Sequence, residues 1–218
     1  MEPMGREASA REPIRLLTIS REYGAGGSEL GVLLGERLGW RVMDQEVAGR
    51  IARRLRCEES DVRALDEHAP SLLERLVASF AVTAPDAAEL PTPVAAPDPD
   101  RLVEATREVL LEAARELPLI VVGHGGNILY RDRPDVLRLR VAAPFEVRVQ
   151  RVARRTGLEP HQAARDVRYR DADRQHYLQR YYHVDAADPH NYDLILNTGT
   201  FSLERAADLI EAAVRGCG

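Results

Sequence analysis

The sequence predicts an α/β fold in which helices cover both faces of a parallel β-sheet. Short apolar segments alternate along the chain with stretches of helical periodicity, and the turn after the first apolar segment is rich in glycine. No internal repeat interrupts this alternation. With 218 residues, 44% of them hydrophobic, the chain is long enough for one compact domain with a small insert.

Five segments are expected to form the strands of the sheet, because each is short and apolar. They are Ile14–Ser20, Trp40–Met43, Pro118–Gly123, Val136–Ala142 and Tyr192–Asn197. In parallel sheets, ligands bind at the carboxyl ends of the strands. The candidate site is therefore expected among residues 21–28, Asp44, 123–127, 142–144 and 197–200.

Seven segments with helical character connect and flank these strands. They are Leu30–Leu38, Gln45–Arg56, Ser71–Val82, Arg101–Leu117, Pro144–Arg155, Glu159–Tyr182 and Leu203–Val214. Gly39 is expected to end the first helix, and Asp100 is expected to cap the fourth. Five prolines fall within Pro85–Pro99, which predicts a surface loop there.

The charge balance excludes several classes of protein. The chain has 30 basic residues (Lys+Arg) against 35 acidic ones, a formal net charge of -5. This balance argues against a nucleic-acid coat or a polybasic membrane binder, so small-molecule partners are expected. Every one of the basic residues is arginine. A chain without lysine cannot use Schiff-base chemistry or the usual lysine of a phosphate loop.

The cysteine count and the first residues predict a cytoplasmic protein. Two cysteines, Cys57 and Cys217, are too few for a disulfide framework or a four-cysteine zinc site. Residues 1–13 lack the apolar segment of a secretory signal and are expected to be a disordered leader. No apolar run is long enough to span a membrane, and the six histidines lack metal-ligand spacing.

The glycine-rich turn after the first strand has three interpretations. A dinucleotide fingerprint would use Asp44 as its acidic residue, but Glu29 is too bulky and has the wrong charge for the third glycine position. A phosphate loop fits the length of Arg21–Ser28, although Arg21 replaces its first glycine and Gly27 its lysine. The third interpretation is a glycine-rich turn that binds no ligand. The phosphate loop is favoured, because backbone N–H groups at a helix N-terminus can cradle an anion.

Five motifs follow one another along the chain: ISREYGAGGSEL, VVGHGGN, APFEVRVQRV, DADRQHYLQRYY and DPHNYDLILNT. Together they resemble the cytidylate kinase-like family of P-loop nucleoside monophosphate kinases, over about Leu16–Ile210. The resemblance implies a three-layer α/β P-loop kinase fold with a five-stranded parallel sheet of order 2-3-1-4-5. It also implies a helical acceptor-binding insert at 44–100, a lid at 155–182, and transfer of the γ-phosphoryl group of ATP, with Mg²⁺, to CMP or dCMP.

The resemblance assigns roles to individual residues. The phosphate loop is Gly24, Ala25, Gly26, Gly27 and Ser28, with the Ser28 hydroxyl expected on Mg²⁺. The acceptor site comprises Asp44, Gln45, Arg50, His124, Asp173 and Arg174. His124 is a departure, since relatives usually read Gly-Arg-Gly where this chain has Gly-His-Gly.

Arginine chemistry adds catalytic candidates. Arg148 and Arg151 are three residues apart and share a helix face, and a guanidinium group binds phosphate oxygens bidentately. These two and Arg170 are expected to clamp the phosphates; the alternative is a solvated helix with intrahelical salt bridges. Arg21 either supplies the charge of the absent lysine or pairs with Glu22 on the surface.

Three functions remain open on the sequence. The first is an ATP-dependent nucleoside monophosphate kinase with a cytidylate-like acceptor. The second is a regulatory nucleotide-binding protein with little catalysis, which the departures at Gly27 and His124 favour. The third is a P-loop kinase for another small metabolite. The acceptor and the oligomeric state are left open.

Overall fold

The computed structural model describes residues 12–44, 46–55 and 99–216. Several predicted features lie outside the described residues. They are residues 1–11 of the expected leader, Gln45, the helix expected over 71–82, the proline-rich loop up to residue 98, and both cysteines.

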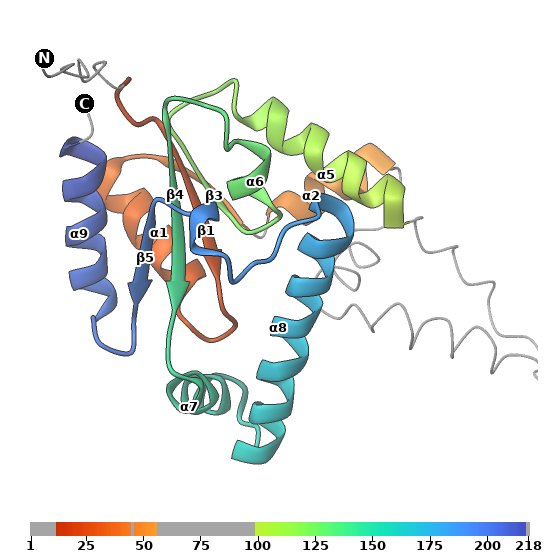
Figure 1. The fold of residues 1–218 in the computed structure, drawn as a ribbon, viewed down its shortest axis with the longest axis vertical. Coiled ribbons are helices and arrows are strands. Elements are labelled where there is room, and N and C mark those ends of the chain that lie inside the picture. Colours follow the sequence, from red (N-terminus) through yellow and green to blue (C-terminus); the bar gives the residue numbers. More distant parts are fainter. Residues whose placement is uncertain (1–11, 45, 56–98, 217–218) are drawn as a thin grey trace, which may run out of the picture. The chain divides into compact units, whose positions relative to one another are not determined.

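Five parallel strands form one sheet in the order β2-β3-β1-β4-β5, which confirms the predicted fold class (Figure 1). The strands are β1 (Leu16–Arg21), β2 (Arg41–Met43), β3 (Leu119–Val122), β4 (Val136–Ala142) and β5 (Leu194–Asn197). Each lies within about two residues of its predicted segment. β1 pairs with β3 on one side and β4 on the other, so its carboxyl end lies at the centre of the ligand-binding edge.

The described helices follow the predicted segments, with several differences. They are α1 (Gly27–Leu38), α2 (Glu46–Leu55), α5 (Pro99–Ala113), α6 (Gly126–Leu129), α7 (Phe145–Thr156), α8 (Pro160–Tyr182), the 3₁₀ helix η1 (Pro189–Asn191) and α9 (Leu203–Gly216). The predicted cap at Asp100 is wrong: α5 begins at Pro99, and Asp100 lies in its first turn. Proline suits a first helical position because its missing N–H has no partner there. Neither the short α6 nor η1 was predicted, and α5 ends at Ala113 instead of Leu117.

Helices pack on both faces of the sheet. Leu17 and Ile19 of β1 lie in a buried cluster with residues of α1 and α9. On the opposite face, a Cβ built on Gly126 of α6 would lie 3.0 Å from Val121 and 3.6 Å from Thr18. Successive strand residues point to opposite faces, and because both faces are covered, all four residues of β3 are apolar and buried.

The chain divides into two compact units. The sheet, α1 and α6–α9 belong to one unit, made of residues 1–44 and 113–218; residues 45–112 form the other. In this second unit, Arg54 of α2 forms ion pairs with Glu108 and Glu112 of α5, at 2.6 and 3.0 Å. The acceptor-binding role expected for the insert stays a prediction.

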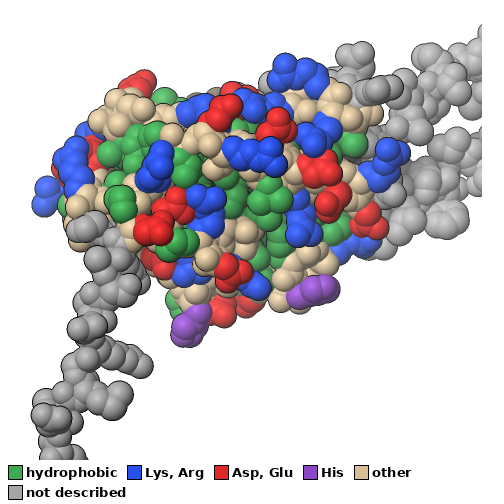
Figure 2. All heavy atoms as spheres, turned by 90° about the horizontal axis from the view of Figure 1, so that it is seen from above, with side chains coloured by type: hydrophobic (Ala, Val, Ile, Leu, Met, Phe, Trp, Pro, Cys, Tyr) green, Lys and Arg blue, Asp and Glu red, His purple; other side chains and the backbone are tan. Residues whose placement is uncertain are grey.

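The surface of the described chain carries mixed charge. Figure 2 shows one face, on which arginine side chains lie among acidic and hydrophobic ones. Ion pairs such as those of Arg37 with Asp208 and of Arg138 with Asp193 neutralise charge locally. None of the helices within the described ranges is long and apolar enough to cross a membrane.

Candidate phosphate-binding site

The loop between β1 and α1 has a backbone that requires glycine at two positions. Gly24 and Gly26 have φ of 80° and 86°, in the left-handed region that side chains disfavour. A Cβ on Gly24 would also lie 2.9 Å from a methyl group of Val152 and 3.0 Å from the carbonyl oxygen of Arg148. The glycines therefore allow the loop to turn tightly and to lie directly against α7.

A pocket of about 210 Å³ opens at this loop. It is lined by Gly24, Gly26, Glu29, Arg151, Arg155 and Leu203. Two arginines of α7 thus face glycine backbone at the start of α1, an arrangement that suits a phosphate group. Glu29 is within 3.6 Å of Arg155 and partly offsets its charge.

Arg151 is held in this pocket by the residue that follows β5. Its guanidinium donates to the Thr198 hydroxyl at 3.0 Å and to the Thr198 carbonyl at 2.7 Å. The same hydroxyl donates to the carbonyl of Ala25 at 2.7 Å. Thr198 is buried, so these bonds link α7, the end of β5 and the phosphate loop.

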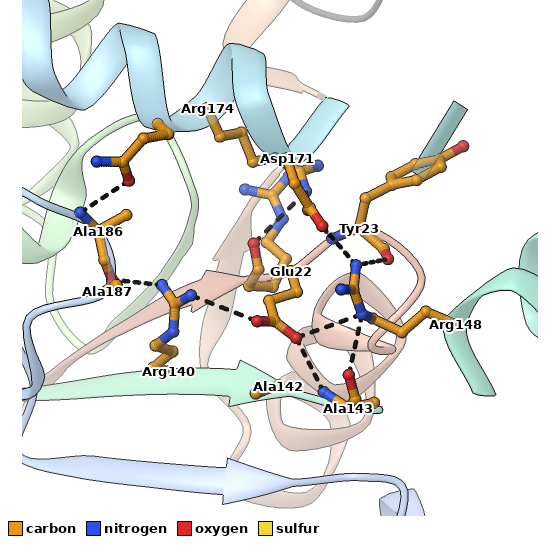
Figure 3. Close-up of polar contacts among 12 residues, drawn as sticks. Glu22, Tyr23, Arg140, Ala142, Ala143, Arg148, Asp171, Arg174, Ala186 and Ala187 are labelled. Carbon is orange, nitrogen blue, oxygen red and sulfur yellow. Dashed lines mark hydrogen bonds and ion pairs between the residues drawn. The ribbon is translucent and has the colours of Figure 1, made fainter. Parts of the chain in front are cut away.

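Arg148 is buried, with 7% of its surface exposed, and its guanidinium contacts the chain on several sides (Figure 3). It donates to the carbonyls of Ala143 and Tyr23 at 3.0 and 3.2 Å. It also pairs with the carboxylates of Asp171 and Glu22, the latter at 3.3 Å. Arg148 is therefore bonded to the glycine loop through Glu22 and Tyr23; its predicted contact with the transferring group stays a prediction.

Glu22 and Asp171 extend this network to the rest of the site (Figure 3). Glu22 accepts from the N–H of Ala143 at 3.1 Å and lies 3.6 Å from Arg140, so it does not pair with Arg21. Asp171 of α8 accepts from the N–H of Tyr23 at 2.8 Å. One carboxylate on the expected lid helix is thereby bonded to the loop backbone and to Arg148.

Tyr23 brings the predicted lid arginines to the loop. Its ring lies under the guanidinium groups of Arg155, Arg170 and Arg174, at 5.3, 4.6 and 5.6 Å from the ring centroid. Such cation–π contacts hold a guanidinium in place while leaving its edge for an anion. Arg170 also pairs with Asp166 at 2.9 Å, one helical turn away.

Sequence reasoning placed Glu22, Tyr23 and Thr198 in the segments expected at the ligand-binding edge but gave them no role in holding the loop, and it did not single out Asp171. The sequence offered one signal for the Tyr23 contacts. Tyr23 is an aromatic residue beside the glycines of the loop, and Arg170 and Arg174 are spaced i,i+4 on the charged helix α8.

The predicted acceptor residues occupy different parts of the chain. Asp44 follows β2 and lies 3.7 Å from Arg21. His124 has a φ of 54° between two left-handed glycines, a backbone strain of the kind found at binding sites. Asp173 and Arg174 lie on α8, and Arg50 lies in the second unit, 3.6 Å from Glu46.

The predicted Mg²⁺ contact involves a single protein side chain, that of Ser28. Among them, no group of three or more histidine, cysteine, aspartate or glutamate side chains could hold a metal ion. Ser28 lies in the first turn of α1, directly after the glycine loop. At the loop, the Ser28 hydroxyl is the side-chain oxygen that would hold a divalent cation.

The sheet order and the helices around it are those of the P-loop kinase fold. Shikimate kinase from Acinetobacter baumannii has the same fold, with a TM-score of 0.51, 14% identity and coverage of 92% of this chain and 93% of that one. Within this class the chain belongs to the cytidylate kinase-like family, which matches residues 16–200.

Curated relatives agree with this assignment. The cytidylate kinase of Methanopyrus kandleri is 32% identical over 129 residues, which cover 56% of this chain and 66% of that protein. The cytidylate kinase of Archaeoglobus fulgidus is 24% identical over 198 residues, covering 91% of this chain and 93% of its own. The chain spans 58% to 66% of the length of six cytidylate kinases that it matches, including the one from Methanopyrus kandleri.

We predict that Arg148→Ala lowers the free energy of unfolding by roughly 1–3 kcal/mol, because charged hydrogen-bond partners lose their donor. Arg154→Ala, an exposed arginine on the same helix, should change it by less than about 0.5 kcal/mol. Urea unfolding followed by circular dichroism measures both. If Arg148→Ala is as stable as the parent but inactive, its role is catalytic and not positional.

Proposed function

We propose that this protein is a nucleoside monophosphate kinase that transfers the γ-phosphoryl group of ATP to a CMP- or dCMP-like acceptor. Family membership and fold support nucleotide kinase activity broadly. The observation that carries the proposal is the pocket in which the left-handed glycines of the loop face Arg151 and Arg155. It lies at the carboxyl end of β1, where parallel α/β sheets bind ligands.

The reaction asks for little covalent chemistry from the protein. The bond between the γ-phosphorus and the β–γ bridging oxygen breaks, and an acceptor phosphate oxygen forms the new bond. The second pKa of a phosphate monoester is about 6, so this oxygen is already deprotonated near neutral pH and needs no general base. Positioning and positive charge then account for most of the catalysis.

The proposed roles follow the geometry of the first unit. The loop from Gly24 to Ser28 binds the ATP phosphates, and the Ser28 hydroxyl would hold the Mg²⁺ that accompanies them. Arg151 and Arg170 neutralise charge on the transferring group, while Arg148 holds the loop.

Acceptor binding is proposed from the family resemblance. It involves Asp44, His124, Asp173 and Arg174, with Arg50 as a contact to the acceptor phosphate. The bound Mg²⁺ would lower the charge repulsion between the two nucleotides.

An acceptor panel tests the proposal. The protein is incubated with Mg-ATP and each nucleoside monophosphate and deoxynucleoside monophosphate in turn, and ADP formation is measured. We expect the highest turnover with CMP or dCMP. Binding of ATP without turnover of any acceptor would favour the regulatory alternative, which the glycine at the usual lysine position supports. Turnover only of acceptors other than nucleotides would favour a metabolite kinase.

Gly26→Val should weaken ATP binding by at least about tenfold, ~1.4 kcal/mol. A Cβ there would lie 3.0 Å from Leu203 at the pocket wall, and φ is 86°. Gly39→Val is the control, because Gly39 has a φ of 68° with no atom within 4 Å of its Cβ position. It carries similar backbone strain but should bind ATP normally by equilibrium titration. Equal ATP affinities in the two variants would contradict the phosphate loop.

Arg151→Ala should lower kcat by a factor on the order of 10²–10³, because charge stabilisation in the transition state is lost. Arg151→Lys should restore activity only in part, since an ammonium group does not reproduce the bidentate contact. Arg154→Ala, on the same helix, should turn over normally. Steady-state kinetics and thermal melting distinguish this from a structural role, in which Arg151→Ala melts earlier but retains its kcat.

A further inference from the structure

The side chain of Arg21 occupies the space that a side chain at position 27 would need. Arg21 is the last residue of β1, and Gly27 is the first residue of α1. A Cβ built on Gly27 would lie 2.6 Å from the Cβ of Arg21 and 2.9 Å from its Cγ. An arginine at 21 and a lysine at 27 therefore exclude one another in this backbone.

A second glycine makes room for the far end of the same side chain. A Cβ on Gly123, which follows β3, would overlap the Nη1 atom of Arg21. The guanidinium thus passes from β1 across the end of β3, and its Nη2 atom lies 3.7 Å from the Asp44 carboxylate after β2. It crosses the ligand-binding edge of three adjacent strands.

The donors of this guanidinium are available for a ligand. Its side chain is 18% exposed, and the 3.7 Å separation from Asp44 exceeds hydrogen-bond length. Within the described parts of the chain, no hydrogen bond from the Arg21 guanidinium is present. A planar cation with five N–H donors, held by an ion pair beside a glycine loop, is ready to bind phosphate oxygens.

The loop departs from the usual phosphate-loop pattern at two positions, 21 and 27, and the two departures are related. A phosphate loop of the form G-x-x-x-x-G-K-S has glycine first and lysine seventh, whereas Arg21–Ser28 has arginine first and glycine seventh. We propose that Arg21 is the phosphate-binding cation of this loop, entering from the strand instead of from the helix. Gly27 and Gly123 are the positions that make room for it. This inference rests on the proposed function.

A set of variants tests whether positions 21 and 27 form one unit. Arg21→Met keeps the apolar stem against Gly27 but removes the charge, so it should melt like the parent and bind Mg-ATP at least about tenfold more weakly. Gly27→Lys alone should also lose affinity, because Arg21 occupies the space. The double variant Arg21→Gly/Gly27→Lys should bind at least about tenfold more tightly than Gly27→Lys, which is a non-additive effect.

Equilibrium titration with Mg-ATP is the readout, with thermal melting as a check on folding and Arg154→Ala as the control. Parental affinity in Arg21→Met, or a double variant no better than Gly27→Lys, would overturn the inference. A different result would contradict the proposed function. If the parent binds Mg-ATP but phosphorylates no acceptor in the panel, kinase activity is wrong, and the titrations still decide the role of Arg21. If the parent does not bind Mg-ATP, both are wrong.

Discussion

A guanidinium group that is almost wholly removed from water needs protein partners for both its charge and its donors, because an unpaired buried charge is strongly destabilising. Arg148 meets this requirement where four segments converge: α7, α8, the loop after β1 and the end of β4. The position of each segment therefore depends on the same group. Its role is specificity of arrangement more than net stability, since burying an ion pair has a large desolvation penalty.

In this chain without lysine, arginine side chains near the glycine loop have different surroundings. Arg148 is buried and bonded to four segments, Arg151 lines the pocket while bonded to Thr198, and Arg170 stacks on Tyr23. Each guanidinium is already held in place by contacts to a part of its surface. Because these side chains are ordered beforehand, binding a phosphate would cost them less conformational entropy. Tyr23 links the loop to α8 through its ring, which lies against Arg170, and through its N–H, which donates to Asp171.

The fold alone does not determine which acceptor molecule the protein phosphorylates. A shikimate kinase shares this architecture, so the sheet and the loop alone are compatible with acceptors that are not nucleotides. The family assignment favours a nucleotide acceptor. Asp44 follows β2 and the left-handed turn at His124 follows β3, so both lie at the edge of the sheet where such folds bind ligands, and we propose them as acceptor contacts on that ground.

The sequence by itself determined the five strands, most of the described helices and the loop, because these depend on local apolar periodicity and on glycines at a strand–helix junction. It could not separate Arg148 from Arg151, which share a helix and differ only in distant partners, Asp171 and Thr198. Nor could it pair Arg21 with Asp44 instead of Glu22. Those choices were made by tertiary structure, since the burial and charge of a side chain depend on segments far away in the chain.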